Sequence, residues 1–282
     1  MFMVINMSKK VLTIQDISCY GSCSITVALP ILSIYGIETV ILPSSILSTH
    51  TGGFHNVVIH DLTNEMPKII DHWISEGISF DAIYTGYVGD NRQFDYILKC
   101  KEKLLKPNGL LIVDPAMADH GKLYSALDES IIDGMKRIVS VADYIIPNIT
   151  EAALLTNNEY REEYDDKYID KLLNDLYNLG AKKIIISGIK NKASIGAAIY
   201  DGKKVEKILA EKQNKSYHGT GDIFSSVIVG NILNNQSLSD AIKDASDFVI
   251  KSIKATDNDI NHTYGVKFEE VLNDRMNKGK QK

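Results

Sequence analysis

The 282-residue chain lacks the features that mark membrane, secreted and disulfide-rich proteins. It has no apolar run near the roughly 18 residues needed to span a bilayer, and its apolar residues 1–7 are too few for a signal-peptide core. Three cysteines, Cys19, Cys23 and Cys100, make no disulfide framework, and no soft ligand follows Cys19 and Cys23 at a standard zinc spacing. We therefore expect small buried thiols, a cytoplasmic location and no membrane partner.

The chain also lacks a basic excess and the common phosphate-binding signatures. Its formal net charge of -5 argues against nucleic acid as a partner, because nucleic-acid binders normally carry a basic face. Neither the Gly-x-x-x-x-Gly-Lys-Ser/Thr pattern of P-loop enzymes nor the protein-kinase signature set occurs. The basic side chains within residues 275–282, among them Arg275, predict a solvated tail. Residues 1–8 are interpreted as an upstream extension, since Met7 is as good a start as Met1.

Short apolar strands alternate with helical segments along the chain. Strands are predicted at residues 10–15, 38–42, 81–85, 110–113, 144–146, 183–186, 196–200 and 204–209. Helices are predicted at residues 22–35, 67–76, 91–106, 129–141, 151–156, 167–179, 224–233 and 239–253. Asp201-Gly202 predicts a hairpin with a type I′ turn between the last two strands. The alternation predicts one α/β domain over residues 1–282, with a mostly parallel central sheet flanked by helices on both faces.

Polar residues follow most of the predicted strands, where ligands bind in open α/β sheets. The candidates are Asp16, Thr51, Tyr87, Asp114, Asp119, Asn148, Glu151 and Ser187. Several of them offer carboxylate or amide oxygens, the ligands that Mg²⁺ prefers beside substrate phosphates. Taken singly, Asn148 to Glu151 is equally typical of a helix cap, and Asp114-Pro115 of a strand-ending turn. Their joint occurrence favours a ligand site at this edge of the sheet.

One short motif adds a reactive group to these candidates. Gly219, Thr220, Gly221 and Asp222 stand directly before an apolar run that predicts a buried helix. A helix start offers unpaired N–H groups and a partial positive charge, which hold phosphate oxygens. Asp222 beside them is suited to accept a proton from an attacking hydroxyl, although an ordinary turn with an N-terminal acid has the same pattern. The helix dipole predicts that Asp222 is ionised at neutral pH and is a weak base.

These motifs resemble the ribokinase-like superfamily and, within it, the pyridoxal/pyridoxamine (vitamin B6) kinase branch. The resemblance covers residues 10–248 and rests on Gly219 to Asp222 together with residues 15–21, 50–52, 85–89, 114–119 and 147–151. It implies ATP-dependent phosphorylation of the 5′-hydroxymethyl group of pyridoxal, pyridoxamine or pyridoxine, in salvage of pyridoxal phosphate. Asp222 would be the base, and Gly219, Thr220 and Gly221 the anion hole.

The resemblance also implies roles for the strand-end residues. Asp16, Thr51 and Tyr87 would contact the vitamer, and Asp114, Asn148, Glu151 and Ser187 the phosphates of ATP. Asp114, Asp119 and Glu151 would hold Mg²⁺ directly or through water. A monovalent cation such as K⁺ and a homodimer are further expectations. Asp16 departs from the serine of many pyridoxal kinases, and its carboxylate suits a protonated ring nitrogen or an amine, which leaves the preferred vitamer open.

Two other functions remain open at this point. A hydroxymethylpyrimidine (phosphate) kinase of thiamine synthesis would act on a similar flat hydroxymethyl heterocycle. A non-catalytic sensor of a vitamer or nucleotide would keep the pocket but could dispense with the base, so the intact Asp222 argues against it. A sugar kinase is disfavoured, because no set of sugar-binding carboxylates follows the first strand.

Overall fold

A nine-stranded sheet forms the centre of the computed structural model, which describes residues 8–257, 259 and 261–279. Its strands are β1 (Lys10–Ser18), β2 (Glu38–Leu47), β3 (Ile59–Asp61), β4 (Phe80–Thr85), β5 (Leu105–Val113), β8 (Tyr144–Ile145), β9 (Lys183–Lys190), β10 (Ser194–Tyr200) and β11 (Val205–Glu211). Their spatial order is β11-β10-β9-β8-β5-β4-β1-β2-β3. The strands from β9 to β2 in this order run parallel. Strand β3 pairs antiparallel with β2 at one edge, and at the other edge β10 pairs antiparallel with both β9 and the edge strand β11. The short strands β6 (Ala118–Asp119) and β7 (Lys122–Leu123) form a separate hairpin.

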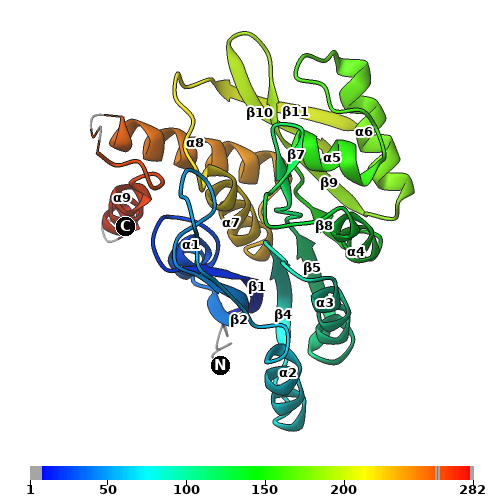
Figure 1. Ribbon diagram of the computed structural model, residues 1–282. Helices are drawn as coiled ribbons and strands as arrows, with labels where there is room; N and C mark the ends of the chain where they lie inside the picture. Colours follow the sequence, from blue (N-terminus) through cyan, green and yellow to red (C-terminus); the bar gives the residue numbers. More distant parts are fainter. Residues whose placement is uncertain (1–7, 258, 260, 280–282) are drawn as a thin grey trace, which may run out of the picture.

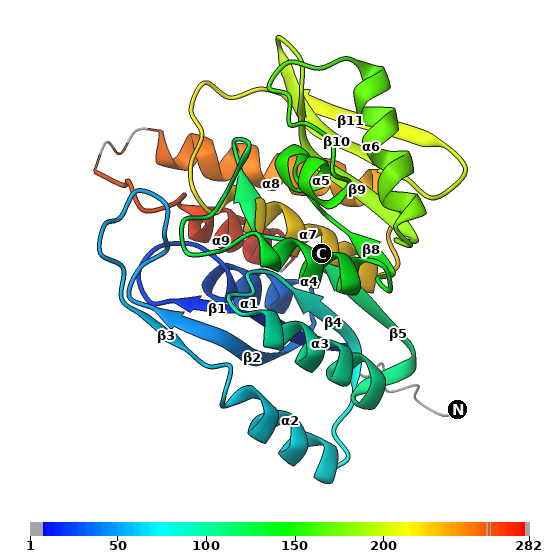
Figure 2. The same ribbon diagram turned by 45° about the vertical axis from the view of Figure 1, so that its right-hand side comes forward.

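Helices cover both faces of this sheet (Figures 1 and 2). They are α1 (Ile25–Ile34), α2 (Met66–Ser75), α3 (Asn91–Lys103), α4 (Ser130–Val139), α5 (Ile149–Leu155), α6 (Asp166–Asn178), α7 (Thr220–Leu233), α8 (Leu238–Thr256) and α9 (Phe268–Gly279). Helices α2 to α6 pack on one face, and α1, α7, α8 and α9 pack on the other. Each described helix is too short or too polar to cross a membrane.

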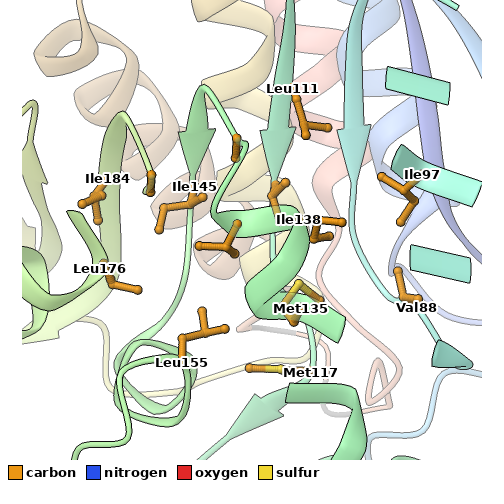
Figure 3. Packing of buried hydrophobic residues seen from close by; sticks show 14 of the residues in the cluster. Val88, Ile97, Leu111, Met117, Met135, Ile138, Ile145, Leu155, Leu176 and Ile184 are labelled. Atoms are coloured by element: carbon orange, nitrogen blue, oxygen red, sulfur yellow. The ribbon is translucent and has the colours of Figure 1, made fainter. Parts of the chain in front are cut away.

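The strand sequences explain this two-sided packing. Successive side chains of a strand point to opposite faces, so an apolar strand supplies both layers of the core. In β5, Leu111 and Val113 join the cluster beneath α2 to α6, whereas Ile112 between them joins the cluster beneath α7 and α8. Figure 3 shows the first of these clusters, with Ile138 of α4 packed near Leu111 and Ile145 of the sheet. The predicted fold class, a mostly parallel sheet with helices on both faces, is confirmed.

Several predicted boundaries are wrong. Strand β1 runs on to Ser18, so Asp16 lies within it, and Ser187 likewise lies within β9. Strands β3, β6 and β7 and helix α9 were not predicted, because the first three are very short and α9 is polar. The hairpin of β10 and β11 is present, but Tyr200 pairs with Val205, which leaves four loop residues rather than a two-residue type I′ turn.

Arg275 contradicts the prediction of a solvated C-terminal tail. It lies in α9, where its guanidinium donates hydrogen bonds to the carboxylate of Asp244 at 2.7 Å and to the hydroxyl of Tyr35 at 2.6 Å. These contacts join α9 to α8 and to the end of α1, and they explain why a basic residue is held here rather than solvated. Lys278 also lies in α9, whereas Lys280 and Lys282, and residues 1–7 of the predicted extension, lie outside the described residues.

Candidate active site

A cavity of about 800 Å³ lies at the carboxyl ends of the parallel strands and at the start of α7. Every residue singled out from the sequence lines it: Asp16, Thr51, Tyr87, Asp114, Asp119, Asn148, Glu151, Ser187, Gly219, Thr220, Gly221 and Asp222. These residues come from segments spread along most of the chain. The position of the cavity follows from the parallel sheet, whose strand ends all open on the same edge.

The start of α7 depends on two glycines with different roles. Gly219 is the N-cap residue and has a left-handed φ of 79°, which favours glycine. A Cβ atom at this position would lie 1.8 Å from the carbonyl oxygen of Ser22, so only glycine fits. At Gly221, in contrast, an added Cβ would meet no atom within 4 Å. The first turn of α7 therefore presents open space to the cavity, while Thr220 is tied back through its hydroxyl to the carbonyl oxygen of Tyr217 at 3.0 Å.

Asp222 lies in the first turn of α7 and is half-buried. Removal of its carboxylate from water, and then the nearby charge of Asp114, raise the pKa of Asp222 to about 7. The prediction of an ordinary, weakly basic carboxylate is therefore wrong, because desolvation and like-charge repulsion outweigh the helix dipole. A carboxyl group with a pKa near neutrality is well matched to accept a proton from a hydroxyl group.

Asp114 stands directly after β5 and is 8% exposed. It accepts hydrogen bonds from the Ser225 hydroxyl at 2.6 Å and from the Ala116 main-chain N–H at 3.2 Å. Burial raises its pKa to about 6. Ser225 was not singled out from the sequence, although its spacing of three residues from Asp222 places both on the same side of α7.

Glu151 and Asn148 form a capping box at the start of α5. Glu151 is buried, and its carboxylate accepts hydrogen bonds from the N–H groups of Asn148 at 2.9 Å and of Met117 at 3.0 Å. The Asn148 amide donates to the carbonyl oxygen of Ala118 at 2.8 Å. The pair thus caps its helix, which confirms the cap interpretation, and at the same time anchors the loop that follows Asp114.

The predicted metal residues do not form a ready-made cage. Among the described residues, no three His, Cys, Asp or Glu side chains come together as a metal site. Asp119 is exposed, and its carboxylate accepts the N–H of the adjacent His120 at 2.8 Å. Asp114 and Glu151 are close enough that the charge of Asp114, after burial, raises the pKa of Glu151. Within the described chain no Lys or Arg pairs with either carboxylate, so their charge favours a cation.

The same cavity also holds the predicted ring-binding residues. Asp16 is buried and accepts hydrogen bonds from the hydroxyls of Ser18, at 2.8 Å, and Ser24. Burial raises the pKa of Asp16 despite these two donors. Tyr87 and Thr51 are half-buried in the same cavity, and burial raises the pKa of Tyr87 to about 12, so its hydroxyl stays protonated.

A third part of the cavity lies between α8 and the β10–β11 hairpin. Its wall includes the apolar side chains of Ile195, Val249, Ile250 and Ile253. Lysines of the following loop, Lys212 and Lys215, stand at its rim. No motif in the sequence marks this region.

We expect Asp222→Asn to stabilise the ligand-free protein more at pH 8 than at pH 5. The folded state holds the Asp222 proton more tightly than the unfolded chain, so stability falls as the pH rises from the ordinary pKa of 3.8 to about 7. Asparagine carries no charge and escapes this loss. The effect is measured by thermal unfolding of the wild-type protein and the variant at both pH values. In a domain of this size, each kcal/mol of change in the free energy of unfolding shifts Tm by about 2 °C.

Two comparisons sharpen this measurement. Any packing effect of the new amide is the same at both pH values. The increase in Tm over wild type at pH 8, compared with that at pH 5, therefore reports the effect of the Asp222 charge alone. Asp119→Asn, on an exposed carboxylate of the same cavity, should leave the Tm nearly unchanged at both. An equal gain for Asp222→Asn at pH 5 and pH 8 would contradict the raised pKa.

Comparison with known proteins agrees with this geometry. The family model for phosphomethylpyrimidine kinase matches residues 31–267. A hydroxymethylpyrimidine/phosphomethylpyrimidine kinase from Aquifex aeolicus is 31% identical over 151 residues, which are 53% of this chain and 58% of that protein.

Solved structures extend the similarity over almost the whole chain. A Bacteroides thetaiotaomicron protein, provisionally named a phosphomethylpyrimidine kinase and crystallised with pyridoxal, is 32% identical, with a TM-score of 0.90 over 95% of this chain and 96% of its own. Pyridoxal kinase from Lactobacillus plantarum is 30% identical, with a TM-score of 0.88 over 97% and 98% of the two chains. The chain therefore belongs to the phosphomethylpyrimidine kinase family, and the predicted resemblance to pyridoxal kinases of the ribokinase-like superfamily is confirmed.

Proposed function

We propose that the protein transfers the γ-phosphoryl group of ATP to the 5′-hydroxymethyl group of a B6 vitamer, yielding the vitamer 5′-phosphate. The observation that carries the proposal is the single cavity that holds both the glycine-aspartate start of α7 and the residues Asp16, Thr51 and Tyr87. The pyridoxal-bound relative and the pyridoxal kinase relative support the vitamer as acceptor. Membership of a kinase family supports transfer of phosphate to an alcohol group.

Asp222 acts as the base in this proposal. Its carboxylate takes the proton of the hydroxymethyl group, the hydroxyl oxygen bonds to the γ-phosphorus, and the bond from that phosphorus to the ADP oxygen breaks. A raised pKa strengthens the carboxylate as a proton acceptor compared with an exposed aspartate. The main-chain N–H groups of Gly219, Thr220 and Gly221 face the charge that develops on the phosphoryl oxygens.

The metal is proposed from the donor set rather than from a preformed cage. Buried Asp114 and Glu151 repel one another and have no cationic partner among the described residues, which is the charge pattern that a cation relieves. Glu151 already accepts main-chain hydrogen bonds, so we propose that it contacts Mg²⁺ through a water molecule. Asp114 would contact the ion more directly. Asp119 would hold outer waters. Mg²⁺ supplies charge neutralisation of the phosphates, and it usually keeps several waters in such sites. Binding of a monovalent cation such as K⁺ stays a prediction.

The nucleotide is proposed to occupy the part of the cavity between α8 and the β10–β11 hairpin. The apolar side chains of Val249, Ile250 and Ile253 suit the flat base of ATP. From there the phosphates reach the start of α7 past Asn148 and Ser187, which adjoin each other through a parallel bridge. The vitamer ring then lies between Asp16 and Tyr87 on the far side of Asp222.

Hydroxymethylpyrimidine is the second candidate acceptor. The family model favours it, and so does the name of the Aquifex aeolicus relative, which contains this pyrimidine and its phosphate. The buried carboxylate of Asp16 argues for the vitamer, because a pyridine ring protonated on nitrogen offers it a charged donor. Measurement of kcat/KM for both acceptors in one assay decides between them.

We also propose a homodimer formed along the β2–β3 edge of the sheet. Ile46, Val58 and Ile59 expose 37%, 69% and 43% of their surface there, and a second chain would cover them. Sedimentation of the purified protein is expected to give a dimer mass, and Val58→Lys is expected to shift it toward the monomer. A monomer mass at all concentrations would contradict the proposal.

The direct test of function is incubation with Mg-ATP and, separately, pyridoxal, pyridoxamine, pyridoxine and hydroxymethylpyrimidine, with the 5′-phosphate detected by mass spectrometry. We expect phosphorylation of at least one vitamer. Asp222→Asn should lower kcat by about 10²- to 10⁴-fold and leave KM nearly unchanged, since the amide keeps the shape but cannot accept the proton. Binding of a vitamer by the wild-type protein without any product would instead indicate a sensor.

Gly221→Ala tests the place proposed for the phosphoryl group. The new methyl group meets no protein atom within 4 Å, so the fold should be kept, but it fills the space in front of the N–H groups. We expect kcat/KM to fall about 100-fold, with Tm equal or higher, because alanine favours a helix over glycine.

Gly219→Ala is the matched control for this variant. Its methyl group collides with the carbonyl oxygen of Ser22, so it should lower Tm as well as activity. Wild-type activity of Gly221→Ala would show that the phosphoryl group binds elsewhere.

A further inference from the structure

The tight turn at Ser22–Ser24, just before α1, is strained where no fold requirement explains it. Ser24 has φ 53° and ψ -130°, a conformation that glycine adopts readily and serine does not. Ser24 is also the N-cap residue of α1, yet its side chain makes no capping hydrogen bond. A serine N-cap normally stabilises its helix through that bond. Ser24 therefore lowers stability in two ways, through its unfavourable backbone conformation and through the missing capping hydrogen bond.

The hydroxyl of Ser24 is used for another contact. It donates to the carboxylate of Asp16, whose second oxygen is held by Ser18 at 2.8 Å. Asp16 is 3% exposed and lines the wall proposed for the vitamer ring. The strain at Ser24 thus orients a donor toward a buried acid instead of toward its own helix.

The other groups of the turn face the start of α7. A Cβ atom added to Gly219 would lie 1.8 Å from the carbonyl oxygen of Ser22 and 3.3 Å from the sulfur of Cys23. Cys23 is buried and lines the cavity. The Cys23 thiol and the Ser24 main-chain N–H lie beside the carboxylate of Asp222 and lower its pKa, against the larger effects of burial and of Asp114. One turn therefore lies against both carboxylates.

We infer that the Ser22–Ser24 turn positions the base, with the Cys23 thiol and the Ser24 N–H aiming the Asp222 carboxylate at the substrate hydroxyl while the Ser24 hydroxyl holds Asp16. The inference rests on the proposed function. Cys23 and Ser24 are positioning residues and do not take part in proton transfer. The turn sets the distance between the group that holds the ring and the group that activates its hydroxymethyl arm.

Cys23 variants test whether this thiol orients the Asp222 carboxylate. Cys23→Ala removes one donor to Asp222, and we expect kcat to fall about 10-fold with the vitamer KM within about twofold of wild type, the size of one lost hydrogen bond. Cys23→Ser restores a donor and should recover most of kcat. Cys100→Ala, which removes a fully buried thiol from α3 on the other side of the sheet, is the control and should lower Tm without lowering kcat.

Ser24→Gly tests the strain and the link to Asp16. Glycine accepts the backbone conformation, so Tm should rise by a few °C even though a hydroxyl is lost. We expect the vitamer KM to rise about 10-fold, because Asp16 loses a donor, and kcat to fall, because the turn no longer has one fixed geometry. A turn that serves the fold alone would give a more stable and equally active enzyme.

The outcomes separate this inference from the proposed function. If the wild-type protein phosphorylates a vitamer but Cys23→Ala and Ser24→Gly keep its kcat and KM, the inference is wrong and the function stands. If the wild-type protein phosphorylates no vitamer, the proposed function fails, and the same variants measured on hydroxymethylpyrimidine decide the inference. Loss of kcat in Cys23→Ser equal to that in Cys23→Ala would also overturn it.

Discussion

Uncompensated negative charge is the constraint around which the cavity is organised. Asp222, Asp114 and Glu151 lie close together at the edge of the sheet, and among the described residues no basic side chain neutralises Asp114 or Glu151. In the free protein the cost appears as raised pKa values. Main-chain N–H groups, the Ser225 hydroxyl and the capping box at α5 reduce that cost without cancelling it. The remaining charge is available to attract a cation and to accept a proton, which are the two needs of phosphoryl transfer.

The fold class and the set of cavity residues could be predicted because both follow from simple periodicity. Apolar strands between helices require a parallel sheet, and a parallel sheet collects its strand ends at one edge. Asp114, Asn148 and Glu151 could be found on this basis although they lie on different elements. The prediction did not need the strand boundaries to be right, since Asp16 and Ser187 lie inside strands and still face the cavity.

What could not be predicted depends on contacts between distant segments. The basicity of Asp222 was misjudged, because its helix is visible in the sequence but the desolvation and the charge of Asp114 are not. The contacts with Asp244 and Tyr35 that hold Arg275 in α9 likewise join segments far apart in the sequence. Ser24 and Cys23 carry no local signal at all: a serine before a helix predicts a cap, and here the side chain turns away from it.

The packing of Gly219 against Ser22 has a consequence for how the protein is made. Asp16 and Ser22 belong to the segment around β1, whereas the start of α7 follows every strand of the described sheet in the sequence. Before α7 is synthesised, the Ser22 carbonyl has no glycine against it and Asp222 is absent. The proposed chemistry thus needs two segments that are distant in the sequence to pack together, so it can begin only after α7 has docked.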